Sequence, residues 1–210
     1  MRRFRFLSAA LAALLVVSTA APAGAELRFS KSFSYFSVGG TTAAELDGAL
    51  SREGPLMKST GARHPGATRI KFGGSVTYVS RGGKCAVGKA VVTLNTRIIL
   101  PRWVNRKRAN PDLALVWDTL SADIKRHEER HAEIARNYAR TLETTLQNLR
   151  PQTDCTEMQA LVARESEKAV AEHDKDQARF DRSEAINFDR RMIRLLQYRL
   201  DTIKRQQAQQ

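Results

Sequence analysis

No apolar run in this chain is long enough to cross a membrane, and the chain contains no internal repeat and no nucleic-acid-binding motif. These absences argue against a transmembrane protein, a repeat protein and a specific nucleic-acid binder. What remains is a chain of 210 residues, which is long enough for one domain of ordinary size.

The first residues have the pattern of an export signal. Three arginines precede an apolar run at residues 7–17, and small residues at 23–25 provide a cleavage site. We therefore predict a signal peptide over residues 1–25, cut after Ala25, and a periplasmic or secreted protein. The alternative is an uncleaved membrane anchor.

Cysteine is scarce: only Cys85 and Cys155 are present, and both follow the predicted signal. An oxidising compartment favours their pairing, so we predict a structural disulfide, with two free thiols as the alternative. The bridge would close a loop of about 70 residues and contribute roughly 4 kcal/mol by restricting the unfolded chain.

Acidic residues are too few to balance the basic ones. The chain has 35 Lys and Arg against 22 Asp and Glu, and its formal charge of +13 falls to +10 without the three arginines of the signal. This charge favours association with an anionic envelope surface or polymer, or it is simply a solvated basic surface.

The sequence changes character near residue 110. Before that point, short segments with strand-like alternation are separated by Gly pairs and turns, at residues 33–38, 68–72, 75–80 and 86–100. Residues 42–50 predict a short helix. The N-terminal half therefore predicts a small antiparallel sheet over residues 33–100.

Two long helices are predicted in the second half. Asn110 and Pro111 are suited to start a helix over residues 111–150, and Asp154 starts another over residues 155–185. The fold class is thus α+β, with the sheet packed on a helical hairpin in one domain, residues 26–185. Residues 186–210 form a basic extension, either a helical arm or a frayed tail.

The pentad His127-Glu128-Glu129-Arg130-His131 has the spacing of a helical zinc site. Residues four apart lie on the same face of a helix, so the two imidazoles can bind one Zn²⁺. Glu128 can then act as general base for a zinc-activated water. The apolar stripe of the same helix includes both histidines, which predicts that they point toward the core or a cleft; the alternative is a pair of hydrogen-bonded core histidines.

A zinc site of this kind needs a third protein ligand. If the two helices form an antiparallel hairpin that turns near residue 152, residue 129 lies opposite residue 176. The candidates within about one turn are Glu172, His173, Asp174, Asp176 and Asp181. His173 lies on the inner stripe of the second helix, and Asp181 is adjacent to it.

Motifs spread over residues 33–185 carry a family resemblance. Tyr35-Phe36-Ser37-Val38-Gly39-Gly40-Thr41, Leu100-Pro101-Arg102-Trp103, the pentad and the two cysteines stand in the same order. The chain resembles a bacterial family of predicted secreted zinc-dependent proteases, catalogued as a domain of unknown function. The resemblance implies zinc ligation by His127 and His131, with Glu128 as catalytic base.

The family's later motif, Tyr-Asp-x-x-Thr-x-His-Gly, is only partly present. Phe180-Asp181 matches its start, but its threonine, histidine and glycine are missing. Asp181 is then the third ligand that the resemblance carries over, and His173 is the substitute suggested by the hairpin.

The sequence therefore favours a zinc metallopeptidase acting on a peptide or protein substrate between the sheet and the helix of the pentad. The first alternative is a non-catalytic envelope protein that binds a partner or an anionic polymer through its basic helices. The second alternative is a domain in which zinc is only structural.

Overall fold

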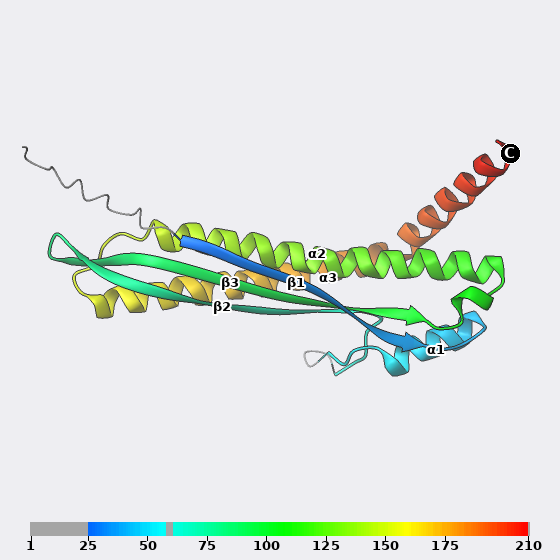
Figure 1. The fold of residues 1–210 in the computed structure, drawn as a ribbon, viewed down its shortest axis with the longest axis horizontal. Helices are drawn as coiled ribbons and strands as arrows, with labels where there is room; N and C mark the ends of the chain where they lie inside the picture. Colours follow the sequence, from blue (N-terminus) through cyan, green and yellow to red (C-terminus); the bar gives the residue numbers. More distant parts are fainter. Residues whose placement is uncertain (1–24, 58–60, 210) are drawn as a thin grey trace, which may run out of the picture.

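The computed structural model describes residues 25–57 and 61–209 of the chain. All but the last residue of the predicted signal peptide, residues 1–25, therefore lies outside the described residues. A three-stranded sheet lies along two long antiparallel helices (Figure 1). In chain order the elements are β1 (Ala25–Val38), α1 (Ala43–Glu53), β2 (Ala67–Arg81), β3 (Lys84–Trp103), η1 (Arg106–Arg108), α2 (Pro111–Gln147) and α3 (Cys155–Gln207).

The α+β class is confirmed, but the sheet is mixed rather than antiparallel. The strand order is β1-β3-β2, with β1 parallel and β2 antiparallel to β3. Val38 and Ala67 pair with Trp103 and Ile99, so β1 ends and β2 begins at the same end of the sheet. The chain runs back along β2, turns at Gly82-Gly83 and inserts β3 between the other two strands, which makes β3 parallel to β1.

The strands are longer than the sequence predicts. The sheet begins at residue 25 instead of 33 and ends at 103 instead of 100, and the segments 68–72 and 75–80 are one strand. Gly73-Gly74 lies within β2 and does not interrupt the strand, whereas Gly82-Gly83 forms the predicted turn. Only the second pair has positive φ angles, +58° and +75°, which favour glycine in a tight hairpin.

Both long helices begin where the sequence predicts. The side chain of Asn110 accepts a hydrogen bond from the amide of Leu113, with Pro111 in the first turn, and Asp154 caps α3 in the same way. Helix α2 ends at Gln147, three residues before the predicted end. Helix α3 continues through residue 185 to Gln207, so the basic extension is part of one helix.

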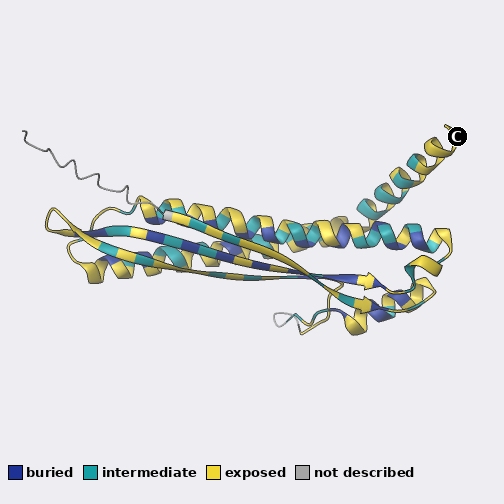
Figure 2. Cartoon of the chain, in the orientation of Figure 1, coloured by how far each residue is buried: buried dark blue, intermediate teal, exposed yellow. Residues whose placement is uncertain are grey.

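Small side chains let α2 lie close to the sheet. Ala132, Ala135 and Ala139 are buried and lie one turn apart on the face that meets β3. Leu94 and Ile98 of β3 are completely buried in the adjoining core. Figure 2 shows dark-blue buried stretches along β3 and on α2, and this packing fixes the rotation of α2 around its axis.

The disulfide is confirmed: Cys85 at the start of β3 is bonded to Cys155 at the start of α3. The backbones of Cys85 and Gln152 also exchange two hydrogen bonds, of 2.9 and 2.8 Å. The loop between α2 and α3 is therefore attached to the β2–β3 hairpin. Among the described residues, no helix is long and apolar enough to span a bilayer.

Candidate metal centre

The pentad lies in the middle of α2, and its side chains face two directions. Glu128 points to the sheet and is buried, with 5% of its surface exposed. The imidazoles of His127 and His131 point to α3 and are 26% and 13% exposed. The most inward residue of the motif is thus the glutamate, and the histidines, predicted to point toward the core or a cleft, lie partly buried against α3.

A carboxylate from α3 completes a cluster with the two histidines. Asp181 Oδ1 lies 2.9 Å from His131 Nε2 and 3.4 Å from His127 Nε2, and the two Nε2 atoms are 3.0 Å apart. Ligand atoms around a tetrahedral zinc are separated by about 3.3 Å, given bonds of about 2.0–2.1 Å. His127, His131 and Asp181 therefore form a possible metal-binding triad.

Gln177 determines which nitrogen of His131 faces the triad. Its Nε2 donates to the backbone carbonyl of His131, at 3.0 Å, so its Oε1 is the atom that lies 2.5 Å from His131 Nδ1. A carbonyl oxygen only accepts, and Nδ1 must therefore carry a hydrogen. Nε2 is left to bind a cation, which is how polar partners commonly orient metal-bound histidines.

His173, the alternative third ligand, lies outside the triad. It is buried, with 4% of its surface exposed, and its ring packs edge-on against Phe72 of the sheet. Its Nδ1 lies 2.9 Å from Asp174 Oδ1, and its Nε2 accepts a hydrogen bond of 2.7 Å from Gln177. Both ring nitrogens are thus engaged, and His173 fixes the amide that orients His131.

His127 has a carboxylate behind it. Glu184 Oε2 lies 3.6 Å from His127 Nδ1, on the side of the ring away from the triad. Glu184 is also in contact with Arg126 and lies 3.2 Å from Arg191 Nη2, and both arginines bind the buried Asp123. Burial opposes ionisation of Glu184, but its contacts with Arg126, Arg191 and His127 together outweigh burial and lower its pKa.

The electrostatics of the triad favour an ionised Asp181 beside a positive charge. Burial opposes ionisation of Asp181, but hydrogen bonds to His127 and His131 outweigh it and hold the pKa of Asp181 well below its usual range. Burial also disfavours charging of His131, yet its bonds to Asp181 and Gln177 raise its pKa. A positive charge is therefore stabilised where the three ligand atoms meet.

Glu128 is held by the beginning of β2. Thr68 Oγ1 lies 2.9 Å from Glu128 Oε2 and 2.8 Å from its backbone carbonyl. A side chain at Gly66 would put its Cβ 3.0 Å from Glu128 Oε1 and 2.8 Å from Ile124, so glycine allows the chain to pack this closely against Glu128. Burial raises the pKa of Glu128, although the nearby charges of His131 and His127 oppose the rise.

Phe180 covers the two imidazoles. Its ring stacks on His127, with centroids 5.0 Å apart and an angle of 24°, and it meets His131 edge-on at 5.1 Å. Phe180 and Glu184 also line an open hollow of about 710 Å³ on the outer side of α2, with Ala122, Lys125, Arg126, Glu129, Arg130 and Glu133. The triad is therefore next to an accessible surface.

In the described part of the chain, the interface between the sheet and α2 is packed beside the pentad. Ile98 and Leu100 of β3 pack there against Ile124 and Ala132 of α2. The expectation of a substrate cleft at this interface is therefore wrong, because these apolar side chains fill it.

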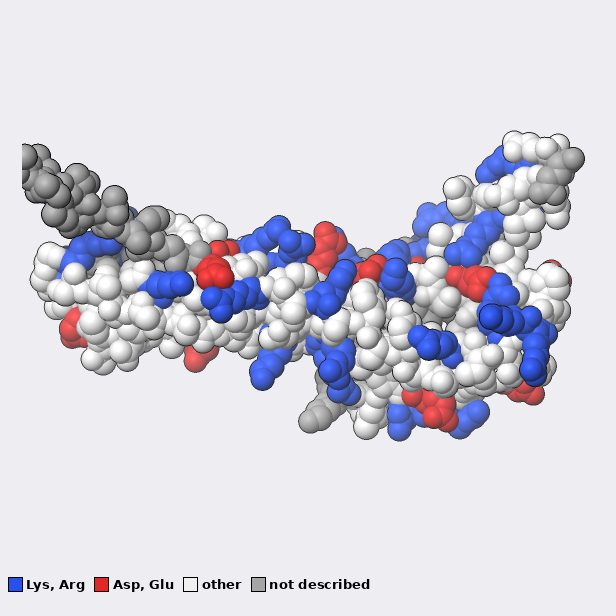
Figure 3. Space-filling model, in the orientation of Figure 1, with Lys and Arg blue, Asp and Glu red and all other residues white. Residues whose placement is uncertain are grey.

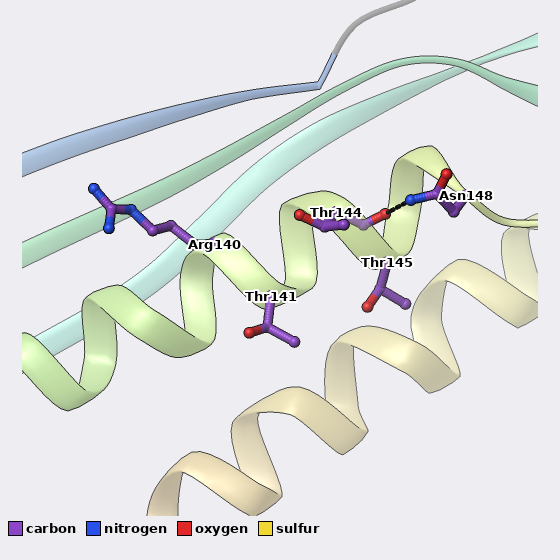
Figure 4. A pocket seen from close by; sticks show the side chains of 5 residues that line it. All are labelled: Arg140, Thr141, Thr144, Thr145 and Asn148. Carbon is purple, nitrogen blue, oxygen red and sulfur yellow. Dashed lines mark hydrogen bonds between the residues drawn. The ribbon is translucent and has the colours of Figure 1, made fainter.

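A second hollow, of about 460 Å³, lies far from the triad on α2. Figure 4 shows that Thr141 and Thr145 point toward α3 while Arg140 points away, and Asn148 Nδ2 donates to the carbonyl of Thr144 at 2.8 Å. Its lining contains no histidine, cysteine or carboxylate. It therefore lacks the ligand types of a metal site.

Sequence reasoning finds His127, His131, Glu128 and Asp181 but misses Gln177 and Glu184. The signal was available, because His173, Gln177 and Asp181 recur every four residues and share one face of α3. Gln177 appears in the sequence only as an uncharged member of that stripe, and its partners depend on how the two helices are aligned.

Comparison with known proteins gives a family and no closer relative. No curated protein and no solved structure matches the chain. Residues 33–188 match the family described as "Bacterial protein of unknown function (DUF922)". This match includes the whole sheet from residue 33, the pentad, Gln177 and Asp181, and so the chain belongs to the bacterial DUF922 family.

Proposed function

We propose that the chain is a periplasmic or secreted zinc-dependent peptidase in which His127, His131 and Asp181 hold the zinc and Glu128 is the general base. One observation carries the proposal: ligand atoms of the three residues lie within 4.8 Å of one another, beside a buried glutamate that directly follows the first histidine. The disulfide is consistent with an oxidising compartment.

The donor set fits a catalytic zinc. Such sites use three nitrogen or oxygen ligands from the protein and leave a fourth position open. The side chain of Asp181 is 55% exposed, so the triad is not closed off from solvent as a structural four-ligand site would be. Zinc held there would bring a bound water to a pKa of about 7 and polarise a substrate carbonyl.

Glu128 would move the proton in this proposal. Thr68 engages its Oε2, and Gly66 packs beside its Oε1, where a Cβ would lie only 3.0 Å away. Burial raises its pKa, and a base whose pKa is closer to neutral accepts a proton more readily. In this proposal its carboxylate turns from Thr68 toward the triad, whose charges already act on it, accepts the proton of the attacking water and returns it to the leaving amine of a peptide.

The hollow beside Phe180 is the proposed site for the substrate. It is lined by Lys125, Arg126 and Arg130 together with three carboxylates, so it presents charged groups of both signs around one aromatic ring. An extended peptide laid along α2 would pass the exposed edge of the triad. The substrate in this proposal is a peptide or protein segment rather than a small metabolite.

Metal analysis tests the ligand set. The chain without its predicted signal is expected to retain about one zinc after incubation with the ion and gel filtration, and Asp181→Asn is expected to lose it. Asp201→Asn changes an aspartate of α3 outside the triad and should retain the metal. Absence of zinc from the parent protein, or equal zinc in both variants, would refute the site.

Gln177→Leu is expected to weaken zinc binding by about 10–100-fold without removing a ligand. Leucine leaves the Nδ1 hydrogen of His131 without its acceptor, and the ring can then rotate or change its tautomer. Gln159→Leu, an exposed position of the same helix, is the matched control. Competition with a chromogenic chelator measures both affinities, and equal values would contradict an orienting role for Gln177.

A further inference from the structure

The last turns of α3 carry an apolar stripe that nothing in the described structure covers. We name residues 186–207 the α3 arm. Ile186, Ile193, Leu200 and Ile203 are 77%, 55%, 43% and 40% exposed. Spacings of seven, seven and three residues put all four on one side of a helix. Solvent-exposed apolar rows of this kind mark a contact surface.

The rest of the α3 arm is basic. It contains Arg190, Arg191, Arg194, Arg199, Lys204 and Arg205 against Asp189 and Asp201. At 100° per residue, Arg194 and Arg205 lie on the side away from the apolar stripe, and Arg190 lies at its edge. Within the part of the chain that the structure describes, these three arginines form no ion pair with a carboxylate.

Arg191 anchors the α3 arm to the body. Arg191 Nε and Nη2 bind Asp123, at 2.9 and 3.2 Å, and Arg191 also lies next to Glu184. Beyond this point the helix rises away from α2 and the sheet (Figure 1). Figure 3 shows basic side chains along the projecting end. The arm is thus fixed at its root, and both its apolar stripe and its basic side are accessible.

We propose that the α3 arm docks the protein on an anionic phospholipid bilayer. A helix that is apolar on one side and rich in Lys and Arg on the other lies in the interface, with its apolar side among the acyl chains and its basic side toward the headgroups. Each basic side chain near such a surface strengthens binding about fivefold. The arm has six basic and two acidic residues, and this surplus of positive charge supplies the attraction.

A second copy of the chain is a poorer occupant of the stripe. The 7-7-3 spacing resembles a coiled-coil seam, in which the flanking positions decide which partners pair. Here the flanking positions include Arg190, Arg199 and Lys204 and no acidic residue. Two copies would place like charges beside the seam in either orientation, whereas an anionic surface would neutralise them.

Sedimentation with phospholipid vesicles tests the proposal. The protein is expected to bind vesicles of phosphatidylcholine with phosphatidylglycerol, but not phosphatidylcholine alone. Binding should weaken steeply in about 1 M salt, where the Debye length falls to about 3 Å. Ile193→Ser with Leu200→Ser should reduce binding more than tenfold, and Arg190→Gln with Arg194→Gln and Arg205→Gln should reduce it on the order of 100-fold.

A charge-matched control separates the α3 arm from the general basicity of the protein. Arg69→Gln with Lys71→Gln and Arg97→Gln removes the same charge from the sheet, where Arg69 and Arg97 are exposed cross-strand neighbours. The affinity of this variant for vesicles should be within about threefold of that of the parent. When the arm is bound to a membrane, the substituted charges lie farther from it than the Debye length and interact with it only weakly. Circular dichroism and zinc content should be the same for all variants.

Three results would overturn the proposal. They are failure to bind anionic vesicles, equal loss of binding in the control from the sheet, and equal binding to neutral vesicles. A concentration-dependent dimer in sedimentation velocity that Ile193→Ser with Leu200→Ser abolishes would instead assign the stripe to a second copy. Because vesicle binding does not require hydrolysis, the outcome is independent of the proposed peptidase activity.

Discussion

Replacing Glu128 with glutamine is expected to slow peptide hydrolysis by about 10²–10⁴-fold while leaving the zinc content unchanged. Glutamine has the same shape and can still accept a hydrogen bond from Thr68 Oγ1, which lies 2.9 Å from Glu128 Oε2. It cannot take up the proton of the attacking water. Cleavage of a fluorescently labelled unfolded protein, measured with metal analysis of the same samples, gives both quantities.

A glutamate farther along α2 provides a matched control for this substitution. Glu143 lies about four turns after Glu128 on the same helix and lines neither hollow. Glu143→Gln removes the same charge and should change the rate by no more than about twofold. A Glu128→Gln protein that holds zinc and cleaves as fast as the parent would contradict the role of Glu128.

Loss of metal would have a different signature. His131→Ala removes a proposed ligand, so zinc and activity would disappear together, whereas Glu128→Gln separates them. The two effects can be separated because the side chains leave α2 in different directions, with Glu128 toward Thr68 of the sheet and His131 toward Asp181 of α3. Coupled loss in both variants would mean that Glu128 supports the site structurally.

The long helices were predictable because their signals are local. Asn110 with Pro111 and Asp154 with its following turn satisfy amide groups within a few residues, whatever the rest of the fold does. The β2–β3 turn at Gly82-Gly83 was predictable for the same reason. The parallel pairing of β1 with β3 was not, because it depends on where the long connection returns the chain to the sheet.

In the candidate site too, local features were predictable and features that depend on the whole fold were not. The pentad is local and its geometry follows from helix periodicity. The choice of Asp181 over His173 depends on the alignment of α2 with α3. The hairpin estimate puts residue 131 opposite 174, but His131 meets Gln177, a shift of three residues or about one turn. That shift brings Asp181 to the histidines and leaves His173 beside Phe72.

The partners behind the candidate ligands were beyond prediction from the sequence. Glu184 and Arg191 are two of many charged residues on α3, and such residues are usually solvated. Only their positions in the fold show that Glu184 faces His127 and that Arg191 binds the buried Asp123. Residue type gave no signal here, because the same residue types line the exposed faces of both helices.

Removing the disulfide is expected to lower the free energy of unfolding by about 4 kcal/mol without changing the zinc site. Cys85 and Cys155 are 70 residues apart in sequence, and a bridge across such a loop restricts the unfolded chain by about that amount. Cys85→Ala with Cys155→Ala is the preferred variant, because Cys85 is buried in an apolar cluster where serine would leave a hydroxyl without a partner.

Urea unfolding in excess chelator gives the measurement, since bound zinc would add stability by mass action and mask the difference. With a slope of about 2 kcal/mol per M, the midpoint should fall by about 2 M. The parent protein in reductant should unfold at the same urea concentration as the double variant. Equal midpoints for the oxidised and reduced parent would show that the hydrogen bonds between Cys85 and Gln152 suffice to hold the loop.

Zinc affinity of the folded double variant should match that of the parent. Cys155 and Gln177 are separated by 22 residues of continuous helix, which is about 33 Å, and the buried side chains of α2 and α3 hold the intervening turns. The disulfide would therefore act on the unfolded chain and on one end of the molecule, while the triad depends on packing at the middle. A large fall in zinc affinity would instead mean that the alignment of α2 with α3 is fixed from the disulfide end.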